Sequence, residues 1–176
     1  MGRLSTKANK TRYQLAREEL GLSRERAGEV LQGLTPERIE KIESERSLPH
    51  PDEVLIMAQG YKKPSLCNYY CANHCPIGQR YVPEIERREL PAIVLEMLAS
   101  LNAVERRKER LIEITADGRI DTPELDDFLR IQAELERISV TVEGLQLWAE
   151  KMLADGKIDR AAYEARKAEF APKEAE

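Results

Sequence analysis

The chain has 176 residues, of which 41% are hydrophobic, 34% charged and 5% aromatic, and its formal net charge at pH 7 is -4. No apolar run approaches the ~20 residues that a membrane-spanning helix needs, so we expect no membrane partner. The N-terminal segment MGRLSTKANK lacks the apolar core of a secretory signal, which predicts a cytoplasmic protein. Long stretches rich in Ala, Glu, Lys, Leu and Arg, without regular strand alternation, predict an all-α fold.

Charge is unevenly distributed along the chain. Residues 1–66 carry 12 Lys/Arg and 10 Asp/Glu, whereas residues 92–176 carry 13 Lys/Arg and 19 Asp/Glu. Residues 1–17 contain five basic residues and no acidic one. A basic arm in front of an acidic protein suits contact with nucleic-acid phosphates, and it suits a solvated tail equally well. The arm residues expected to contact phosphate are Lys7, Lys10 and Arg12.

Four short helices are predicted in residues 12–63. The first ends at Gly21, a favourable residue after a helix C-terminus. Ser23 can cap the N-terminus of a second helix and Thr35 that of a third. Pro36 then occupies the first position of the third helix, where its missing N–H costs nothing. Two acidic residues after the segment LPHP favour a fourth helix.

Several features at characteristic spacings lie between residues 12 and 60. They are Leu22-Ser23, the small residues Ala27 and Gly28, the core pair Ile39 and Ile42 followed by Glu43, and Arg46 followed by Pro49. Together they resemble the lambda repressor/Cro-like (XRE-type) helix-turn-helix family of transcription regulators. The resemblance implies a compact helical bundle that places its third helix in the major groove of double-stranded DNA.

The third predicted helix differs from the family pattern in charge. The turn before it, residues 31–35, has one residue more than the common spacing, and residues 36–46 carry a net charge of -1. Acidic side chains can accept a hydrogen bond from cytosine but repel phosphate. This face is therefore also consistent with a solvated surface or a protein-binding surface.

The resemblance nevertheless implies a set of DNA-binding residues in this segment. By analogy with the motif, Arg38, Glu40 and Lys41 are expected to reach base edges, and Arg24 and Arg46 to hold phosphates. Thr35 and Glu37, at the start of the third helix, complete the expected set.

A cluster of three cysteines follows the helix-turn-helix segment. Cys67, Cys71 and Cys75 are spaced by four, so in a helix their thiols share one face. A fourth ligand from the adjacent His74 or the upstream His50 would complete a Cys3His zinc site, and three thiolates also suit an iron–sulfur cluster. However, His74 and Cys75 are neighbours and cannot easily bind one ion in a regular helix. The alternative is that the cysteines are small buried side chains on a helix packed against the first domain.

The C-terminal half predicts a long antiparallel helical hairpin. Apolar residues recur at heptad-like spacing over residues 90–111 and again over residues 125–152, with the segment ADGRID between them. The second helix, of about 30 residues, is longer than the first and leaves apolar surface that a homodimer would cover. Alternatively, the two stripes pair only with each other or fold back on the first domain. A second segment, ADGKID, predicts another helix end and helix start at residues 154–159.

The sequence thus divides into a basic arm (1–11), a helix-turn-helix domain (12–63), a short cysteine-rich linker (64–90) and a helical hairpin (91–170). There is no phosphate-binding loop, GxSxG motif or dinucleotide fingerprint, so we expect a protein that is not an enzyme. The favoured hypothesis is a sequence-specific DNA-binding transcription regulator whose cysteine cluster responds to metal or redox state. The alternative is a protein-interaction adaptor built on a helix-turn-helix fold and an acidic hairpin.

Overall fold

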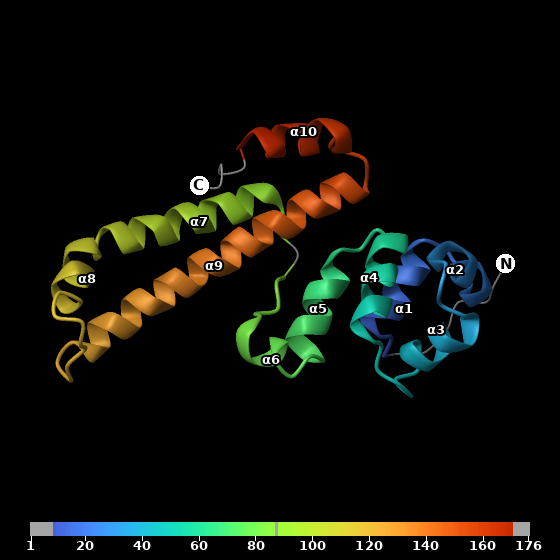
Figure 1. The fold of residues 1–176 in the computed structure, drawn as a ribbon, viewed down its shortest axis with the longest axis horizontal. Helices are drawn as coiled ribbons and strands as arrows, with labels where there is room; N and C mark the ends of the chain where they lie inside the picture. The colour runs from blue at the N-terminus through green and yellow to red at the C-terminus, as the bar shows by residue number, and fades with distance from the viewer. Residues whose placement is uncertain (1–8, 87, 171–176) are drawn as a thin grey trace, which may run out of the picture. The chain divides into compact units, whose positions relative to one another are not determined.

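The structure is a computed structural model that describes residues 9–86 and 88–170. Over these ranges the chain forms ten α-helices and no strand, which confirms the predicted all-α fold (Figure 1). The chain divides into two compact units, one formed by residues 1–84 with 149–176 and the other by residues 85–148. None of the helices in the described ranges is both long enough and apolar enough to cross a membrane.

Helices two and three of the first unit begin directly after Ser23 and Thr35, as predicted. The hydroxyl oxygens of Ser23 and Thr35 each accept a hydrogen bond from a backbone N–H at 3.2 Å, which satisfies donors that a helix N-terminus leaves free. Thr11 caps the first helix in the same way. The helices are α1 (Arg12–Glu19), α2 (Arg24–Leu31), α3 (Pro36–Glu43) and α4 (Pro51–Gly60).

Small residues allow α2 to pack closely against α3 and α4. Ala27 is fully buried between these helices. A Cβ on Gly60 would lie 2.4 Å from Leu31 Cδ2, and one on Gly28 would lie 3.2 Å from the Leu34 carbonyl oxygen. The apolar side chains that fill the core around this contact include Ile39, Ile42, Val54, Met57 and Tyr61.

Two further helices, α5 (Ser65–Asn73) and α6 (Gly78–Tyr81), belong to the same unit. Leu66 joins the core of α1–α4, and Cys67, Tyr69 and Tyr70 pack against it. A Cβ on Gly78 would lie 2.0 Å from the Cys71 carbonyl oxygen, so the approach of α6 to α5 requires glycine. The segment expected from the sequence to be a linker is therefore largely a packed extension of the helix-turn-helix bundle.

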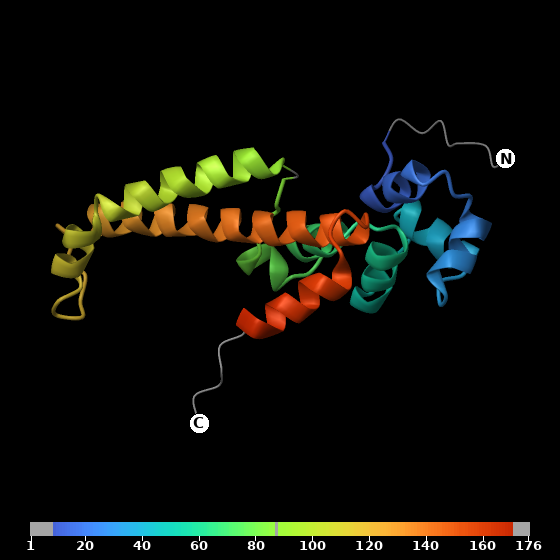
Figure 2. The same ribbon diagram turned by 90° about the horizontal axis from the view of Figure 1, so that it is seen from above.

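The second unit contains α7 (Leu90–Glu105), α8 (Lys108–Ile114) and the part of α9 (Leu125–Ala154) up to residue 148. Figures 1 and 2 show α7 and α8 lying alongside α9 in the opposite direction, as predicted for a helical hairpin. The first arm is broken between α7 and α8 rather than continuous. Arg110 Nε donates to Asp127 Oδ2 at 2.8 Å and so connects α8 to the start of α9. The buried apolar residues of this unit are Ile93, Ile114 and Ile131.

The repeated segments ADGRID and ADGKID lie where one helix ends and before the next begins. Gly118 and Gly156 have φ of 74° and 70°, the left-handed conformation that favours glycine after a helix C-terminus. Asp159 Oδ1 then accepts from the Ala162 N–H at 2.6 Å and caps the last helix, α10 (Arg160–Phe170). Both copies therefore serve as connections between helices.

Candidate nucleic-acid interface

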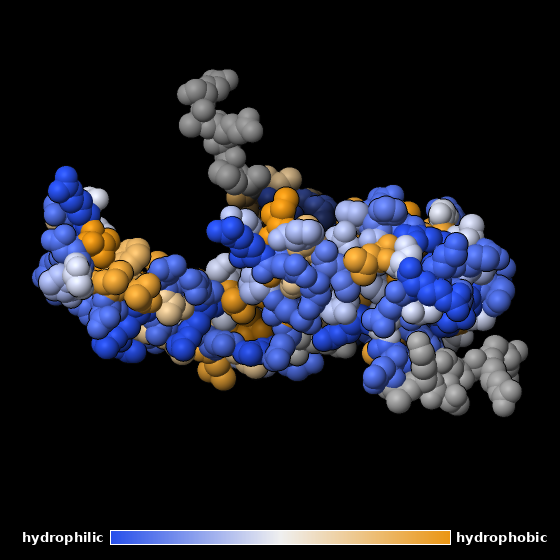
Figure 3. All heavy atoms as spheres, turned by 90° about the horizontal axis from the view of Figure 1, so that it is seen from below, coloured by the Kyte–Doolittle hydropathy of each residue, from blue (hydrophilic) through white to orange (hydrophobic). Residues whose placement is uncertain are grey.

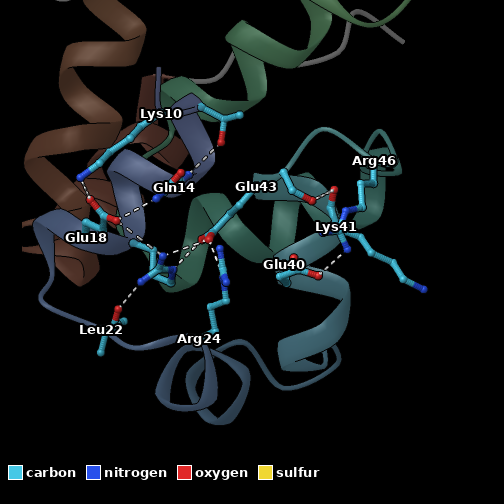
Figure 4. A network of polar contacts seen from close by, with 12 residues as sticks. Lys10, Gln14, Glu18, Leu22, Arg24, Glu40, Lys41, Glu43 and Arg46 are labelled. Atoms are coloured by element: carbon cyan, nitrogen blue, oxygen red, sulfur yellow. Dashed lines mark hydrogen bonds and ion pairs between the residues drawn. The ribbon is translucent and has the colours of Figure 1, made fainter. Parts of the chain in front are cut away.

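Helix α3 has one face buried in the core of the domain and an opposite face exposed to solvent. Ile39 and Ile42 are buried in the core, whereas Glu37 and Lys41 are exposed on the opposite side. Lys41 forms no ion pair with any residue that the structure describes, and its side chain extends away from the domain (Figure 4). The exposed face of α3 is thus available to a partner along at least one helical turn.

Arg38 is bound within the domain instead of extending toward solvent. Its Nε and Nη2 donate to the two carboxylate oxygens of Glu53, each at 2.6 Å. Nη1 donates to Ser47 Oγ at 2.7 Å, and Nη2 also donates to the Leu48 carbonyl at 3.0 Å. The hydrogen bonds from Arg38 hold the pKa of Glu53 below its usual value, against the effect of burial. Arg38, expected from the motif to reach base edges, therefore connects α3 to the following loop and to α4.

Arg24 shares a buried carboxylate with Arg17. The carboxylate of Glu43 is almost completely buried and accepts from Arg17 Nε at 2.5 Å and from Arg24 Nε at 2.9 Å. Arg24 keeps 37% of its side-chain surface exposed, whereas the Arg17 side chain is only 8% exposed. Figure 4 shows Arg24 reaching from α2 to Glu43 on α3. Arg24 can thus contact a surface ligand while still paired, and the Glu43 carboxylate joins α3 to Arg17 of α1 and to Arg24 of α2.

The other basic residues expected to hold phosphate also have acidic partners. Arg46 Nη1 lies 3.3 Å from Glu40 Oε2, and Lys10 Nζ lies 2.6 Å from Glu18 Oε2. Lys7 lies outside the described residues. A phosphate that binds these side chains would replace a carboxylate of the chain itself.

Arg12 is paired with the segment that follows α6. Its Nη2 lies 3.1 Å from Glu84 Oε1, and its guanidinium lies 5.4 Å from the centre of the Tyr69 ring. Glu84 also accepts from Asn73 Nδ2 at 3.0 Å. The start of α1 is therefore connected both to α5 and to the segment beyond α6.

Two carboxylates stand at the N-terminal ends of α2 and α3. The backbone N–H of each glutamate and the nearby capping hydroxyl, Ser23 for Glu25 and Thr35 for Glu37, lower the pKa of both carboxylates. The charge of Glu25 opposes that effect at Glu37, because the two helix ends lie near each other. Glu25 was not among the residues predicted from the sequence, although an acid two residues after a capping serine is a recognisable signal.

The structure does not bring the predicted metal ligands together. Cys67 and Cys71 lie on α5, Cys75 follows it, and all three are half-buried free thiols. Burial raises the pKa of Cys67, as do Glu150 and Cys71 nearby, and Cys75 Sγ accepts from the Gly78 N–H at 3.4 Å. Within residues 9–86 and 88–170, no group of three or more His, Cys, Asp or Glu side chains is placed to hold a metal ion. The described Cys and His side chains are therefore not arranged as ligands of one ion in this structure, and the zinc or iron–sulfur site stays a prediction.

His74, the expected fourth ligand, packs among tyrosines. Its ring centre lies 5.3 Å from that of Tyr69, 6.0 Å from that of Tyr70 and 6.4 Å from that of Tyr13. Burial raises the pKa of Tyr13 well above its usual value. The ring of His74 thus packs the end of α5 against α1. This agrees with the alternative that the cysteine segment is a helix packed against the first domain.

Comparisons with protein-family models, with curated proteins and with solved structures find no match to this chain.

Proposed function

We propose that the protein is a sequence-specific DNA-binding transcription regulator that reads double-stranded DNA with α3. The observation that carries this proposal is the division of α3 into a buried face and an exposed face that bears Glu37 and Lys41. The capped helices α2 and α3 pack directly on each other, which is the arrangement a helix-turn-helix uses to insert its second helix into the major groove.

Phosphate contacts in this proposal come from Arg24, Arg46, Lys10 and Arg12. Except for Arg24, each of them would exchange an exposed or part-buried ion pair for a phosphate. Exposed pairs contribute about 0–1 kcal/mol, so the exchange costs little at Arg12 and Arg46, whereas the Lys10–Glu18 pair is part-buried. Release of counterions from the DNA should make binding weaken steeply with salt.

The test is binding of labelled duplex DNA, chosen by selection from random sequences, to wild-type protein and to Lys41→Ala. We expect Lys41→Ala to weaken binding about tenfold or more if Lys41 contacts a base or a phosphate in the groove. Lys167→Ala is the matched control, because Lys167 is exposed on α10, far along the chain from α3. Equal binding by both variants would contradict the use of α3.

A homodimer formed through the second unit belongs to the same proposal. Leu95 is 68% exposed, and Leu98 and Leu129 are each 50% exposed, although all three are on helices of the hairpin. Figure 3 shows apolar side chains gathered at the surface near the end of this unit that bears α8. A second copy would cover such a surface and would present two α3 helices to two half-sites. Light scattering on the purified protein tests this directly, with Leu95→Glu/Leu98→Glu expected to shift a dimer toward monomer.

A protein-interaction adaptor is the second candidate. It is favoured by the carboxylates of Glu25 and Glu37 on the surface that would face DNA, and by the exposed apolar residues of the hairpin. Failure of the folded protein to enrich any duplex at low salt would favour the adaptor over the regulator.

A further inference from the structure

We infer that Glu37 reads a cytosine, so that each half-site of the DNA target contains a C·G base pair beneath the first turn of α3. This inference rests on the proposed DNA-binding function and names the base that the exposed face of α3 selects.

The position of Glu37 on α3 is well defined. The backbone around it is held by the Thr35 cap at 3.2 Å and by Pro36 in the first helical position. Its side chain is exposed on the face opposite Ile39 and Ile42, so it is the first outward side chain that would enter a groove with α3. It forms no ion pair with any described residue, in contrast to Glu40 on the same helix, and its carboxylate interacts with its own helix start, where the backbone N–H and the Thr35 hydroxyl lower its pKa.

The chemistry of a carboxylate then limits what Glu37 can accept in a groove. It cannot bind a phosphate, and the major-groove donors are the amino groups of cytosine and adenine. Adenine places its N7 acceptor beside its amino group, so the second carboxylate oxygen would face an acceptor. Guanine and thymine present acceptors where the carboxylate needs a donor. Cytosine is therefore the base that a carboxylate at this position favours.

Lys41 strengthens the inference from the same face of the helix. It lies four residues after Glu37, so the two side chains are neighbours along α3. A lysine donates to the O6 and N7 acceptors of guanine. One helical turn of about 5.4 Å spans one to two base pairs at about 3.4 Å each, so the half-site should hold a cytosine and a guanine at that separation.

The experiment is selection of random duplex DNA by the full chain, carried out in parallel with Glu37→Gln and with Glu136→Gln. Glu136 is an exposed glutamate on α9, and its replacement makes the same chemical change outside the first unit. Wild type and Glu136→Gln should enrich the same site, with a cytosine whose change to thymine weakens binding about tenfold to hundredfold. Glu37→Gln should enrich adenine at that one position, because an amide can donate to N7 and accept from N6 together.

The outcomes separate this inference from the function on which it rests. A site enriched by wild type in which Glu37→Gln leaves every base preference unchanged would overturn the inference and keep the DNA-binding function. A wild-type site without a required cytosine would do the same. Absence of any enriched site, with circular dichroism showing a folded protein, would overturn both.

Discussion

Arg17 Nε lies 2.5 Å from Glu43 Oε1, and this contact joins side chains that are 26 positions apart and almost completely buried. Arg17 Nη2 donates to the second oxygen of the same carboxylate at 3.0 Å, and Arg24 donates to it as well. One buried negative charge is thus shared by two guanidinium groups from α1 and α2. Because both charges of the Arg17–Glu43 pair are removed from water, each depends on the other.

We predict that Glu43→Gln destabilises the first unit by about 3 kcal/mol or more, because it removes the closer of the two carboxylates that pair with the buried Arg17 and leaves only Glu18, at 3.8 Å. Urea unfolding followed by circular dichroism measures the change. Glu40→Gln is the matched control on the same helix, since Glu40 pairs with the exposed Arg46 and its removal should cost less than about 1 kcal/mol. Equal losses of stability in the two variants would mean that the buried Glu43 pair contributes no more to stability than the exposed Glu40 pair.

The starts of α2 and α3 could be predicted because their signals are local. Ser23, Thr35 and Pro36 each determine a helix start through their own chemistry, and the structure places α2 and α3 at those starts. The break between α7 and α8 has no capping residue, glycine or proline to mark it, because Arg106 and Arg107 lie there. Its one sign in the sequence is Lys108, which interrupts the apolar spacing and is the first residue of α8.

The candidate site was harder to predict because its contacts connect distant parts of the chain. The motif placed Arg38 on α3, but its pairing with Glu53, 15 positions later, depends on how the loop before α4 folds. The cysteine spacing places thiols on one face only if the segment is helical, and Cys67 and Cys71 do lie on a helix. It could not distinguish thiols that face an ion from thiols that pack beside the core, since both need the same helical repeat.

Gly78 provides a second prediction, based on the close approach of α6 to α5. Gly78→Ala should destabilise the first unit by about 1–3 kcal/mol, because its Cβ would meet the rigid backbone of Cys71 at 2.0 Å. Gly144→Ala is the contrasting variant. Its Cβ would lie 3.8 Å from Ile85, an ordinary contact in the middle of α9, so it should stabilise by up to about 1 kcal/mol. Thermal unfolding measures the change in stability of each variant. A Gly78→Ala variant as stable as wild type would contradict this packing of α6 on α5.

The cysteine segment gives a third prediction. If the thiols serve packing, protein purified without oxygen should carry no stoichiometric zinc or iron, and a chelator should leave its unfolding temperature unchanged. Replacement of Cys67, Cys71 and Cys75 by alanine should cost roughly 1–3 kcal/mol from lost packing, without any change in metal content. Elemental analysis and thermal unfolding provide the two measurements. One equivalent of metal per chain, with a lowered unfolding temperature after chelation, would restore the metal-site hypothesis.

The pair formed by Arg38 and Glu53 gives a prediction about acid. The pKa of Glu53 is lowered in the folded chain, chiefly because its carboxylate accepts hydrogen bonds from Arg38. A carboxylate whose pKa falls on folding stabilises the fold above its unfolded pKa, and this contribution disappears as the pH falls through the folded value. Wild type should therefore lose more stability than Glu53→Gln between about pH 5 and pH 3. The measurement is the unfolding free energy at a series of pH values, with Asp52→Asn as control because Asp52 is an exposed neighbour on the same helix turn. If Glu53→Gln and wild type have parallel pH profiles in this window, the contact between Arg38 and Glu53 does not hold α3 to α4 in solution.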